Sequence, residues 1–489
     1  MRTRTTTLFI QSAAALAAAL LLAPAGLARQ AAPAWAITGA RVHTAAGAPI
    51  DNATVLVRDG VIAAVGTSVT VPADAVVIDA AGQNVYPGLI DMGSSAPIEA
   101  PEGQQAQAGG GRGGGGGFGG RGGGGGAQQT KEEAERAKRE ALLRPDYSAE
   151  EHLQGTSAMQ EQLASAGVTA VLAVSDSGIF KGTSALVNTL LPPDDPQISD
   201  VAGYRKGLAV IKAPVAQHVN IAGRAGGTGY PQSLLGSIAF ARQGFYDAQW
   251  QRDAEAYYQR TGAKGPRPLI EPALDALAPA LARQLPVAFD ADLAREIDRV
   301  LTIASTFNLD PIVVGASGAA ERTAELKAAG AKVILSLNYP GGGGGRGGGG
   351  GGFGGRGGGG QPTLAALEAQ RDAPKTAAAV AAAGIPFAFT SDGMQTAADF
   401  VRNAGRAVRD GGLAADVALR ALTIDAARLA GAADRVGSIE TGKIANLIVV
   451  EGDLFDNGRI RQVFIAGRPV EIQPAAAPAT GRGGRGGDR

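Results

Sequence analysis

The chain has 489 residues, with 45 Lys and Arg, 45 Asp and Glu, three His and no Cys. This length allows one large barrel domain plus a smaller domain. The balanced charge excludes a net electrostatic attraction to nucleic acid or to an anionic membrane. The lack of cysteine excludes disulfides, thiolate metal ligands and a cysteine nucleophile.

The N-terminus has the features of a secretory signal peptide. Arg2 and Arg4 precede an apolar segment from Leu8 to Leu22, and Gly26-Leu27-Ala28 offers small residues for cleavage. We therefore expect residues 1–28 to be removed. The mature protein is then expected to be periplasmic or secreted, with no membrane anchor.

The segment from Trp35 to Ile78 has a pattern typical of β-strands. Two of its apolar runs flank Asp59-Gly60, a dipeptide that favours the positive φ angles of a tight hairpin turn. Apolar runs return near the other end of the chain, first at residues 445–450. The sequence therefore predicts one small β-sandwich built from both termini, residues 29–84 and 436–475.

The middle of the chain, residues 85–435, alternates apolar strands with helical patterns. Ser148 and Glu151 have the spacing of a capping box, which predicts a helix that ends near Gly167. Repeated strand–helix units of this kind favour a parallel sheet, and their number favours an α/β fold with a (β/α)8 TIM barrel. The predicted strands include residues 168–174, 287–290, 312–314, 333–337 and 387–390.

Three segments are rich in glycine: residues 109–126, residues 341–360 and residues 481–489, the last within an expected flexible tail at 476–489. Such runs bury little apolar surface, so we expect flexible loops, two of them over the carboxyl-terminal face of the barrel. Arg-Gly-Gly sequences also occur in nucleic-acid-binding segments. Arginine is sparse here, and each internal segment has one phenylalanine, Phe118 or Phe353. We therefore favour linkers and expect no nucleic-acid partner.

Four segments resemble one family, the amidohydrolases, and especially their imidazolonepropionase-like branch. They are Val85-Tyr86-Pro87-Gly88-Leu89-Ile90-Asp91, Phe389-Thr390-Ser391-Asp392, Thr423 to Gly431 and Val436 to Leu447. The resemblance implies a barrel with a composite β-domain, and metal-assisted hydrolysis of C–N bonds in amides and cyclic amides. In that family zinc or another divalent ion activates a water molecule, and an aspartate accepts its proton.

The ligand positions that the resemblance implies are mostly changed in this chain. Histidines are expected as a pair after the first strand and singly at the ends of the fifth and sixth strands, and an aspartate ends the eighth. The residues found there are, in order, Gly93 and Ser95, Asp290, Gly315 or Ala316, and Asp392. For the Lys or Glu that the family often has near the fourth strand, the approximate matches are Asn188 and Gly223. Only Asp392 is retained, as a catalytic residue that is vestigial without a metal-bound water.

The histidine count gives the same result without an alignment. His43 falls in the β-rich opening and His152 in the first turn of a predicted helix, so only His218 could approach the barrel mouth. A site with four histidines is therefore impossible.

Two other sites use residues that are present. Asp91, Asp290 and Asp392 could form a carboxylate site for Mg²⁺ or Ca²⁺, although each also has an easy structural role. Ser94 and Ser95 could act as nucleophiles, but neither has a histidine at a predictable distance. Asp290 and Asp392 are thus the candidate metal ligands, and we assign no cofactor.

These observations predict an amidohydrolase-family protein, by resemblance a hydrolase of non-peptide, cyclic-amide-type C–N bonds. Its degenerate metal site predicts weak or absent metal-dependent catalysis. The alternative is a non-catalytic partner subunit of an intact amidohydrolase. The expected partners are a small-molecule ligand at the barrel mouth and either a second copy of the chain or an intact homologue.

Overall fold

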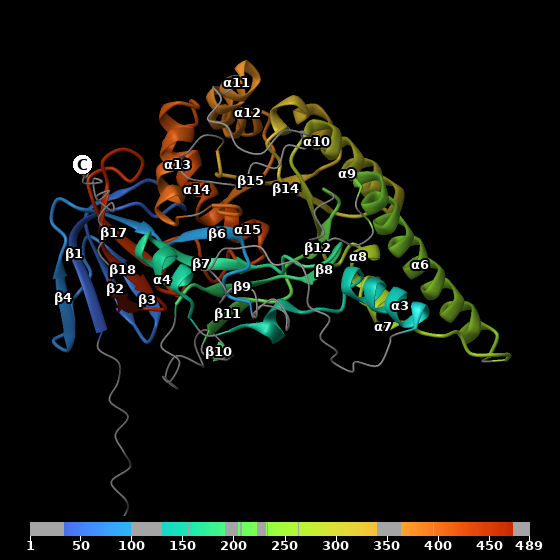
Figure 1. The fold of residues 1–489 in the computed structure, drawn as a ribbon. Coiled ribbons are helices and arrows are strands. Elements are labelled where there is room, and N and C mark those ends of the chain that lie inside the picture. The colour runs from blue at the N-terminus through green and yellow to red at the C-terminus, as the bar shows by residue number, and fades with distance from the viewer. Residues whose placement is uncertain are drawn as a thin grey trace, which may run out of the picture.

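The computed structural model describes residues 34–98, 130–154, 156–190, 204–205, 208–222, 231, 233–262, 264–339, 363–394 and 396–472 (Figure 1). The expected signal peptide, both expected internal glycine-rich loops and the expected tail lie outside these residues. No helix formed by the described residues is long and apolar enough to cross a membrane.

One side of the molecule is an eight-stranded sheet built from both ends of the described chain (Figure 1). Strands β17, β5 and β1 are neighbours in it, so the two ends hydrogen-bond directly to one another. The sheet buries its own apolar cluster, which includes Ile37, Val55 and Phe464. Its strands are β1 (Ala34–Val42), β2 (Ile50–Arg58), β3 (Val61–Gly66), β4 (Ala75–Asp79), β5 (Asn84–Pro87), β17 (Leu447–Glu451), β18 (Arg459–Ile465) and β19 (Arg468–Val470).

The hairpin between β2 and β3 confirms the turn predicted at Asp59-Gly60. The strands pair in antiparallel fashion, and the two turn residues have φ angles of 52° and 80°. Positive φ at both central positions matches the right-handed twist of the flanking strands.

A second group of strands forms the barrel region. They are β6 (Leu89–Ser94), β7 (Val168–Ala173), β8 (Phe180–Thr183), β9 (Ala185–Asn188), β12 (Gln217–Asn220), β13 (Val287–Ala291), β14 (Pro311–Gly315), β15 (Lys332–Ser336) and β16 (Phe387–Thr390). β6 and β7 are parallel, and β12 through β16 are parallel in chain order. A short hairpin, β10 (Tyr204–Arg205) and β11 (Leu208–Lys212), extends the edge beside β9.

The strands β8 and β9 run against the direction of the others. They are separated only by Ser184, and together they lie antiparallel between β12 and β7. A parallel crossover takes about a dozen residues or more, and the connection 174–179 is too short for one. The expected all-parallel arrangement is therefore wrong at this position.

The ring of strands is not closed by a backbone ladder. β16 lies beside β6, but the two are joined through side chains: Thr390 Oγ1 donates to the Gly93 carbonyl at 2.9 Å. The described residues thus form a mixed α/β barrel region with an additional sheet, and they show no closed barrel of eight parallel strands.

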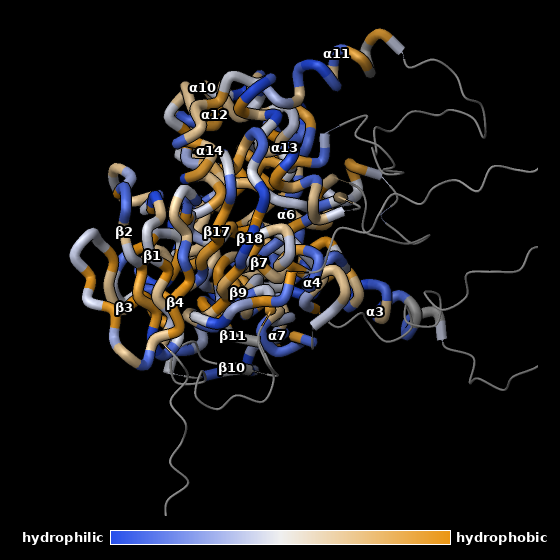
Figure 2. The backbone as a smooth tube through the Cα atoms, turned by 90° about the vertical axis from the view of Figure 1, so that its left-hand side faces the viewer, coloured by the Kyte–Doolittle hydropathy of each residue, from blue (hydrophilic) through white to orange (hydrophobic). Residues whose placement is uncertain are grey.

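Helices follow each of the strands β12 to β16, and apolar segments are concentrated in the strands (Figure 2). Helix α6 is the longest and runs along one edge of the molecule (Figure 1). The helices are α3 (Lys131–Leu142), η1 (Ala149–His152), α4 (Ala158–Ser165), α6 (Leu234–Arg260), α7 (Pro272–Asp275), α8 (Ala278–Leu281), α9 (Ala294–Phe307), η2 (Ala319–Glu321), α10 (Thr323–Ala328), α11 (Leu364–Asp372), η3 (Ala373–Lys375), α12 (Thr376–Ala382), α13 (Ala398–Arg409), α14 (Ala415–Ala421) and α15 (Ile424–Leu429).

The helix predicted from Ser148 is broken into two pieces. Ser148 precedes only the 3₁₀ turn η1 and makes no side-chain cap hydrogen bond. The capping box lies at Ser157 instead, where the hydroxyl accepts from the Gln160 N–H and the Gln160 side chain accepts from the Ser157 N–H. The helical prediction was correct for residues 158–165 and wrong for its first part.

Candidate site at the barrel mouth

The carboxyl ends of the parallel strands define one edge of the barrel, which we call the mouth. Because β8 runs in the opposite direction, its beginning lies at this edge. The Asn220 N–H, at the end of β12, donates to the Ile179 carbonyl at 2.7 Å, which fixes that position. Lys181, near the start of β8, is thereby brought among the ends of the parallel strands.

Lys181 forms an ion pair with Asp290, which is on β13. Its Nζ donates to Asp290 Oδ2 at 2.9 Å, and the two side chains are only 10% and 26% exposed. The pairing of β8 with β12 shifts register at this point, and the next residue, Gly182, has φ of 91°. A Cβ at Gly182 would lie 2.2 Å from the Tyr147 carbonyl oxygen, so only glycine fits.

Asp392 follows β16 and completes what we call the mouth cluster: Lys181, Asp290 and Asp392. Its N–H donates to Thr390 Oγ1 at 3.1 Å, and the residue remains exposed to solvent. Desolvation by the surrounding protein raises the pKa of Asp392, the negative charge of Asp290 raises it further, and the positive charge of Lys181 opposes the shift. The three side chains therefore interact electrostatically.

Asp91, on β6, is fully buried and directed toward β16. Its Oδ1 accepts from the Ser391 N–H at 2.9 Å and the Gly93 N–H at 3.2 Å, and its Oδ2 accepts from the Ser391 hydroxyl at 2.5 Å. Burial raises the pKa of Asp91 to about 6, although these hydrogen bonds act in the other direction. The carboxylate therefore links the two strands at the seam.

Two positions where the resemblance implies histidines have little room for a side chain. A Cβ at Gly93 would lie 2.9 Å from Thr390 Oγ1. At the end of β14, Gly315 has φ of 91° and a Cβ there would lie 2.3 Å from Asp292 Oδ1, and Ala316 has φ of 50°. Larger residues there would require the neighbours or the backbone to move.

His218 lies inside the barrel rather than at the mouth. It is 2% exposed, its Nε2 lies 2.9 Å from Ser184 Oγ, and its Nδ1 has no hydrogen-bond partner among the described residues. Burial lowers its pKa to about 3, and the Lys181 charge lowers it further. The imidazole is therefore neutral.

The other histidines and the candidate serines are distributed elsewhere. His43 stacks on Tyr86 with ring centroids 4.4 Å apart, and His152 stacks on Tyr147 at 4.1 Å. Ser94 accepts a hydrogen bond from the Ala96 N–H, and Ser95 is exposed at the end of β6. No histidine contact supports either serine as a nucleophile among the interactions of the described residues.

Sequence reasoning missed Lys181 and Asn220. Asn220 is opposite Asp290 in the β12–β13 register, so it occupies the fourth-strand position at the mouth. Asn188, one of the two matches named for that position, lies at the other end of the barrel and is bonded to Asn446 at 2.7 Å. Gly223 lies outside the described residues. Lys181 lies in the short strand Phe180–Thr183, in which only Phe180 is a large apolar residue, so the sequence pattern gave no signal for it.

The donor set does not fit the divalent ion that the resemblance implies. Asp91 is engaged by Ser391, and Asp290 is paired with the Lys181 ammonium. In the described part of the chain, no three His, Asp or Glu side chains converge closely enough to bind a metal ion. The proposed carboxylate site of Asp91, Asp290 and Asp392 is therefore not assembled.

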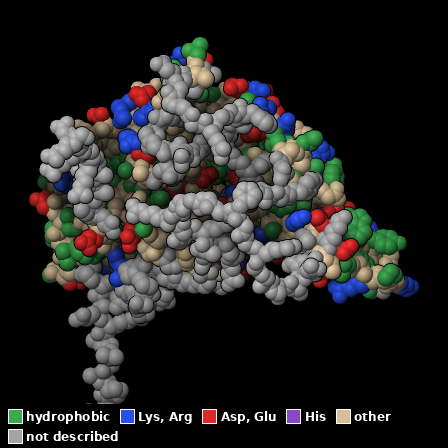
Figure 3. Space-filling view, viewed as in Figure 1, with side chains coloured by type: hydrophobic (Ala, Val, Ile, Leu, Met, Phe, Trp, Pro, Cys, Tyr) green, Lys and Arg blue, Asp and Glu red, His purple; other side chains and the backbone are tan. Residues whose placement is uncertain are grey.

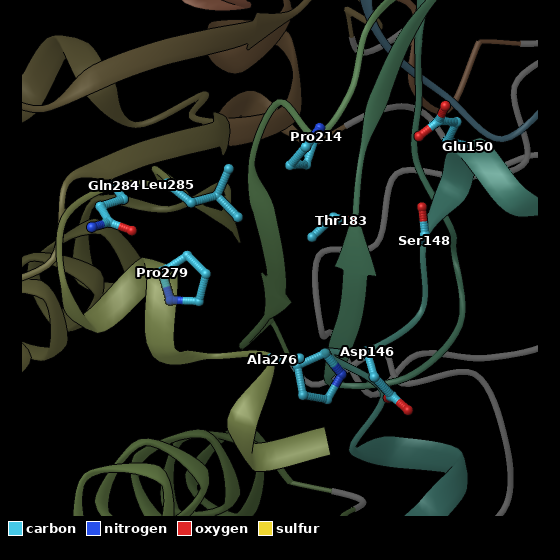
Figure 4. Close-up of a pocket in the computed structure, with 10 residues that line it drawn as sticks. Asp146, Ser148, Glu150, Thr183, Pro214, Ala276, Pro279, Gln284 and Leu285 are labelled. Atoms are coloured by element: carbon cyan, nitrogen blue, oxygen red, sulfur yellow. The ribbon is translucent and has the colours of Figure 1, made fainter. Parts of the chain in front are cut away.

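A cavity of about 320 Å³ lies at the opposite end of the barrel (Figure 4). Thr183 ends β8, Pro214 precedes β12 and Leu285 precedes β13, so the cavity faces the amino ends of the parallel strands. It is separate from the mouth. Its lining is Pro145, Asp146, Ser148, Glu150, Thr183, Pro214, Ala276, Pro279, Gln284 and Leu285.

Comparison with known proteins agrees with this architecture. Residues 363–470 match the model of the amidohydrolase family. Over these C-terminal residues the chain is similar to the amidohydrolases. No protein of curated function matches the sequence significantly.

Solved amidohydrolase structures share the fold. An amidohydrolase from Thermotoga maritima MSB8 aligns with a TM-score of 0.66 and 19% identity, over 90% of this chain and 100% of that one. A putative prolidase from Bifidobacterium longum aligns with a TM-score of 0.50 and 18% identity, over 91% and 97% of the two chains. At these identities the likeness concerns the fold and not the activity.

Proposed function

We propose that this protein is an amidohydrolase relative that does not carry out the family's metal-dependent C–N bond hydrolysis and that uses the barrel mouth to bind a small molecule. The observation that carries the proposal is the Lys181–Asp290 ion pair at the end of β13. An ammonium group there repels a divalent cation and occupies the oxygen donor that would bind it.

The positions around the ion pair support the same proposal. A side chain at Gly93 or Gly315 would require Thr390 or Asp292 to move, and Gly315 and Ala316 have positive φ angles that larger residues rarely adopt. Restoring histidines would therefore need rearrangement of the mouth as well as substitution. We therefore propose that the mouth is organised around the Lys181–Asp290 ion pair, and that substituting histidines alone would not create a metal site.

Asp392 is exposed and is the group at the mouth to which we assign ligand binding. Without a metal-bound water it has no activated water to deprotonate, so its raised pKa serves no hydrolytic step of the usual kind. It can still accept hydrogen bonds from a ligand. We therefore retain Asp392 as a binding residue and treat its catalytic role as vestigial.

An activity assay tests the proposal. The mature protein is incubated with dipeptides, N-acyl amino acids and cyclic imides, with and without added Zn²⁺, beside Asp392→Ala. We expect no zinc-stimulated hydrolysis in the wild type above the level of the variant. Turnover that requires zinc and disappears in Asp392→Ala would show a working hydrolase.

The partnership with an intact amidohydrolase stays a prediction, as does the exported location. Affinity purification of the tagged protein from its native cells tests the partnership. It predicts stoichiometric copurification of a second amidohydrolase that has both first-strand histidines. Recovery of this chain by itself would count against it.

A further inference from the structure

The mouth cluster contains a positively charged side chain, the Lys181 ammonium group. Lys181 is paired with Asp290 on β13, interacts with Asp392 after β16, and lies near enough to His218 on β12 to affect its charge. One ammonium group thus pairs with a carboxylate on β13 and acts electrostatically on side chains at β12 and after β16. In catalytic amidohydrolases, by the resemblance described above, a metal ion joins groups from the ends of several strands.

The reversed direction of β8 explains how the lysine reaches this position. In a parallel strand a residue near the start would lie at the far end of the barrel. Because β8 is antiparallel to β12, its start lies beside Asn220 and Asp290 at the mouth. The register shift and the positive φ of Gly182 occur beside Lys181. The antiparallel direction of β8 therefore places the Lys181 ammonium group at the mouth.

We infer that the Lys181 ammonium is a tethered replacement for the metal cation and neutralises the carboxylates at the mouth. This inference rests on the proposed loss of metal-dependent hydrolysis. Lys181 Nζ lies 2.9 Å from Asp290 Oδ2, and the negative charges of Asp290 and Asp176 raise the pKa of Asp392 while the Lys181 charge lowers it. Without Lys181, the largely buried Asp290 carboxylate would lose its ion-pair partner.

Without the ammonium group, the mouth should therefore bind a divalent cation from solution. In Lys181→Met we expect a lower Tm than in the wild type. We further expect 1 mM MnCl₂ to raise the Tm of this variant by at least about 2 °C, because a bound ion stabilises the folded state by mass action. The wild type should show no such increase, because its ammonium repels the ion.

Two further variants identify the cause. Lys332→Met removes another partly buried ion pair, with Asp310 at 2.6 Å, at the other end of the barrel strands; its lysine is 29% exposed, against 10% for Lys181. It should lose stability without gaining a response to manganese. In Lys181→Met/Asp290→Asn the uncompensated carboxylate is removed, so the manganese response should disappear.

If Lys181→Met is obtained only in an unfolded form, its refolding yield with and without 1 mM MnCl₂ tests the same expectation. A Tm or yield that does not change with manganese would overturn the inference, as would an equal response in Lys332→Met. These outcomes are separate from the activity assay. Zinc-dependent turnover by the wild type would instead overturn the proposed function.

Discussion

At the scale of single residues, the buried Asp91 carboxyl joins β6 to the end of β16 by hydrogen bonds, and its burial lowers the unfolding free energy at neutral pH. Burial raises its pKa from 3.8 to about 6 while Ser391 and Gly93 donate hydrogen bonds to it. The folded state therefore holds the Asp91 proton more tightly than the unfolded state does. Its contribution to stability falls as the pH rises from about 4 to about 6, and is constant above that range.

Asp91→Asn tests this pH dependence. The amide is neutral at every pH, so the variant avoids a penalty of about 3 kcal/mol that the wild type acquires between pH 4 and pH 7.5. We expect the variant to become more stable relative to the wild type as the pH rises, in urea denaturation at pH 4, 5, 6 and 7.5. A constant difference in unfolding free energy would mean that Asp91 has the same pKa in both states.

Gly93 tests how tightly the protein is packed at a position where the resemblance implies a histidine. Gly93→Ala places a Cβ 2.9 Å from Thr390 Oγ1. This close contact should lower the unfolding free energy by about 1–2 kcal/mol. Thr390→Ala in the same chain removes the clashing oxygen. The two changes together should therefore cost less than the sum of their separate effects. Strict additivity would show that the mouth accommodates the added methyl group without strain.

At the scale of elements, most strands and helices could be predicted because their apolar residues recur at regular spacing. The segments 287–290 and 312–314 are observed as β13 and β14, and the helix between them is α9. Strand direction could not be predicted in the same way. An apolar run such as Ala185–Asn188 has the same pattern whether its neighbours are parallel or antiparallel.

The site could be predicted only in part for the same reason. Asp290 and Asp392 were correctly placed at strand ends, where the chain order and the family pattern agree. Lys181 lies at the start of a strand, and only the reversed direction of β8 brings it to Asp290. A pairing between residues so distant in the chain requires knowledge of the sheet topology.

The N-terminus of α4 provides a matched test of two serines. Ser157→Ala should lower the unfolding free energy by about 1 kcal/mol, because the hydroxyl accepts from the Gln160 N–H. Ser148→Ala should have little effect, since the Ser148 side chain makes no cap hydrogen bond. Urea denaturation of both variants measures the difference. A larger loss of unfolding free energy for Ser148→Ala than for Ser157→Ala would instead favour the predicted capping box at Ser148 and Glu151.

At the scale of the whole molecule, the fold is like that of a solved amidohydrolase structure, and the mouth holds the Lys181–Asp290 ion pair. Both chain ends share one sheet beside the barrel, and β12 through β16 keep their parallel order. Acidic and basic side chains are interspersed on the described surface visible in Figure 3, in keeping with 45 residues of each sign. The charged groups on which the proposed function depends are those of the mouth cluster, Lys181, Asp290 and Asp392.

The metal content of the wild-type protein tests the central claim most directly. The mature chain is dialysed against Zn²⁺ and Mn²⁺ in turn, freed of unbound ions, and measured by mass spectrometry of the elements. We predict less than about one tenth of an ion per chain, because the Lys181 ammonium occupies the mouth and repels divalent cations. One ion per chain, lost in Asp290→Ala/Asp392→Ala, would contradict the account and restore a metal-dependent hydrolase.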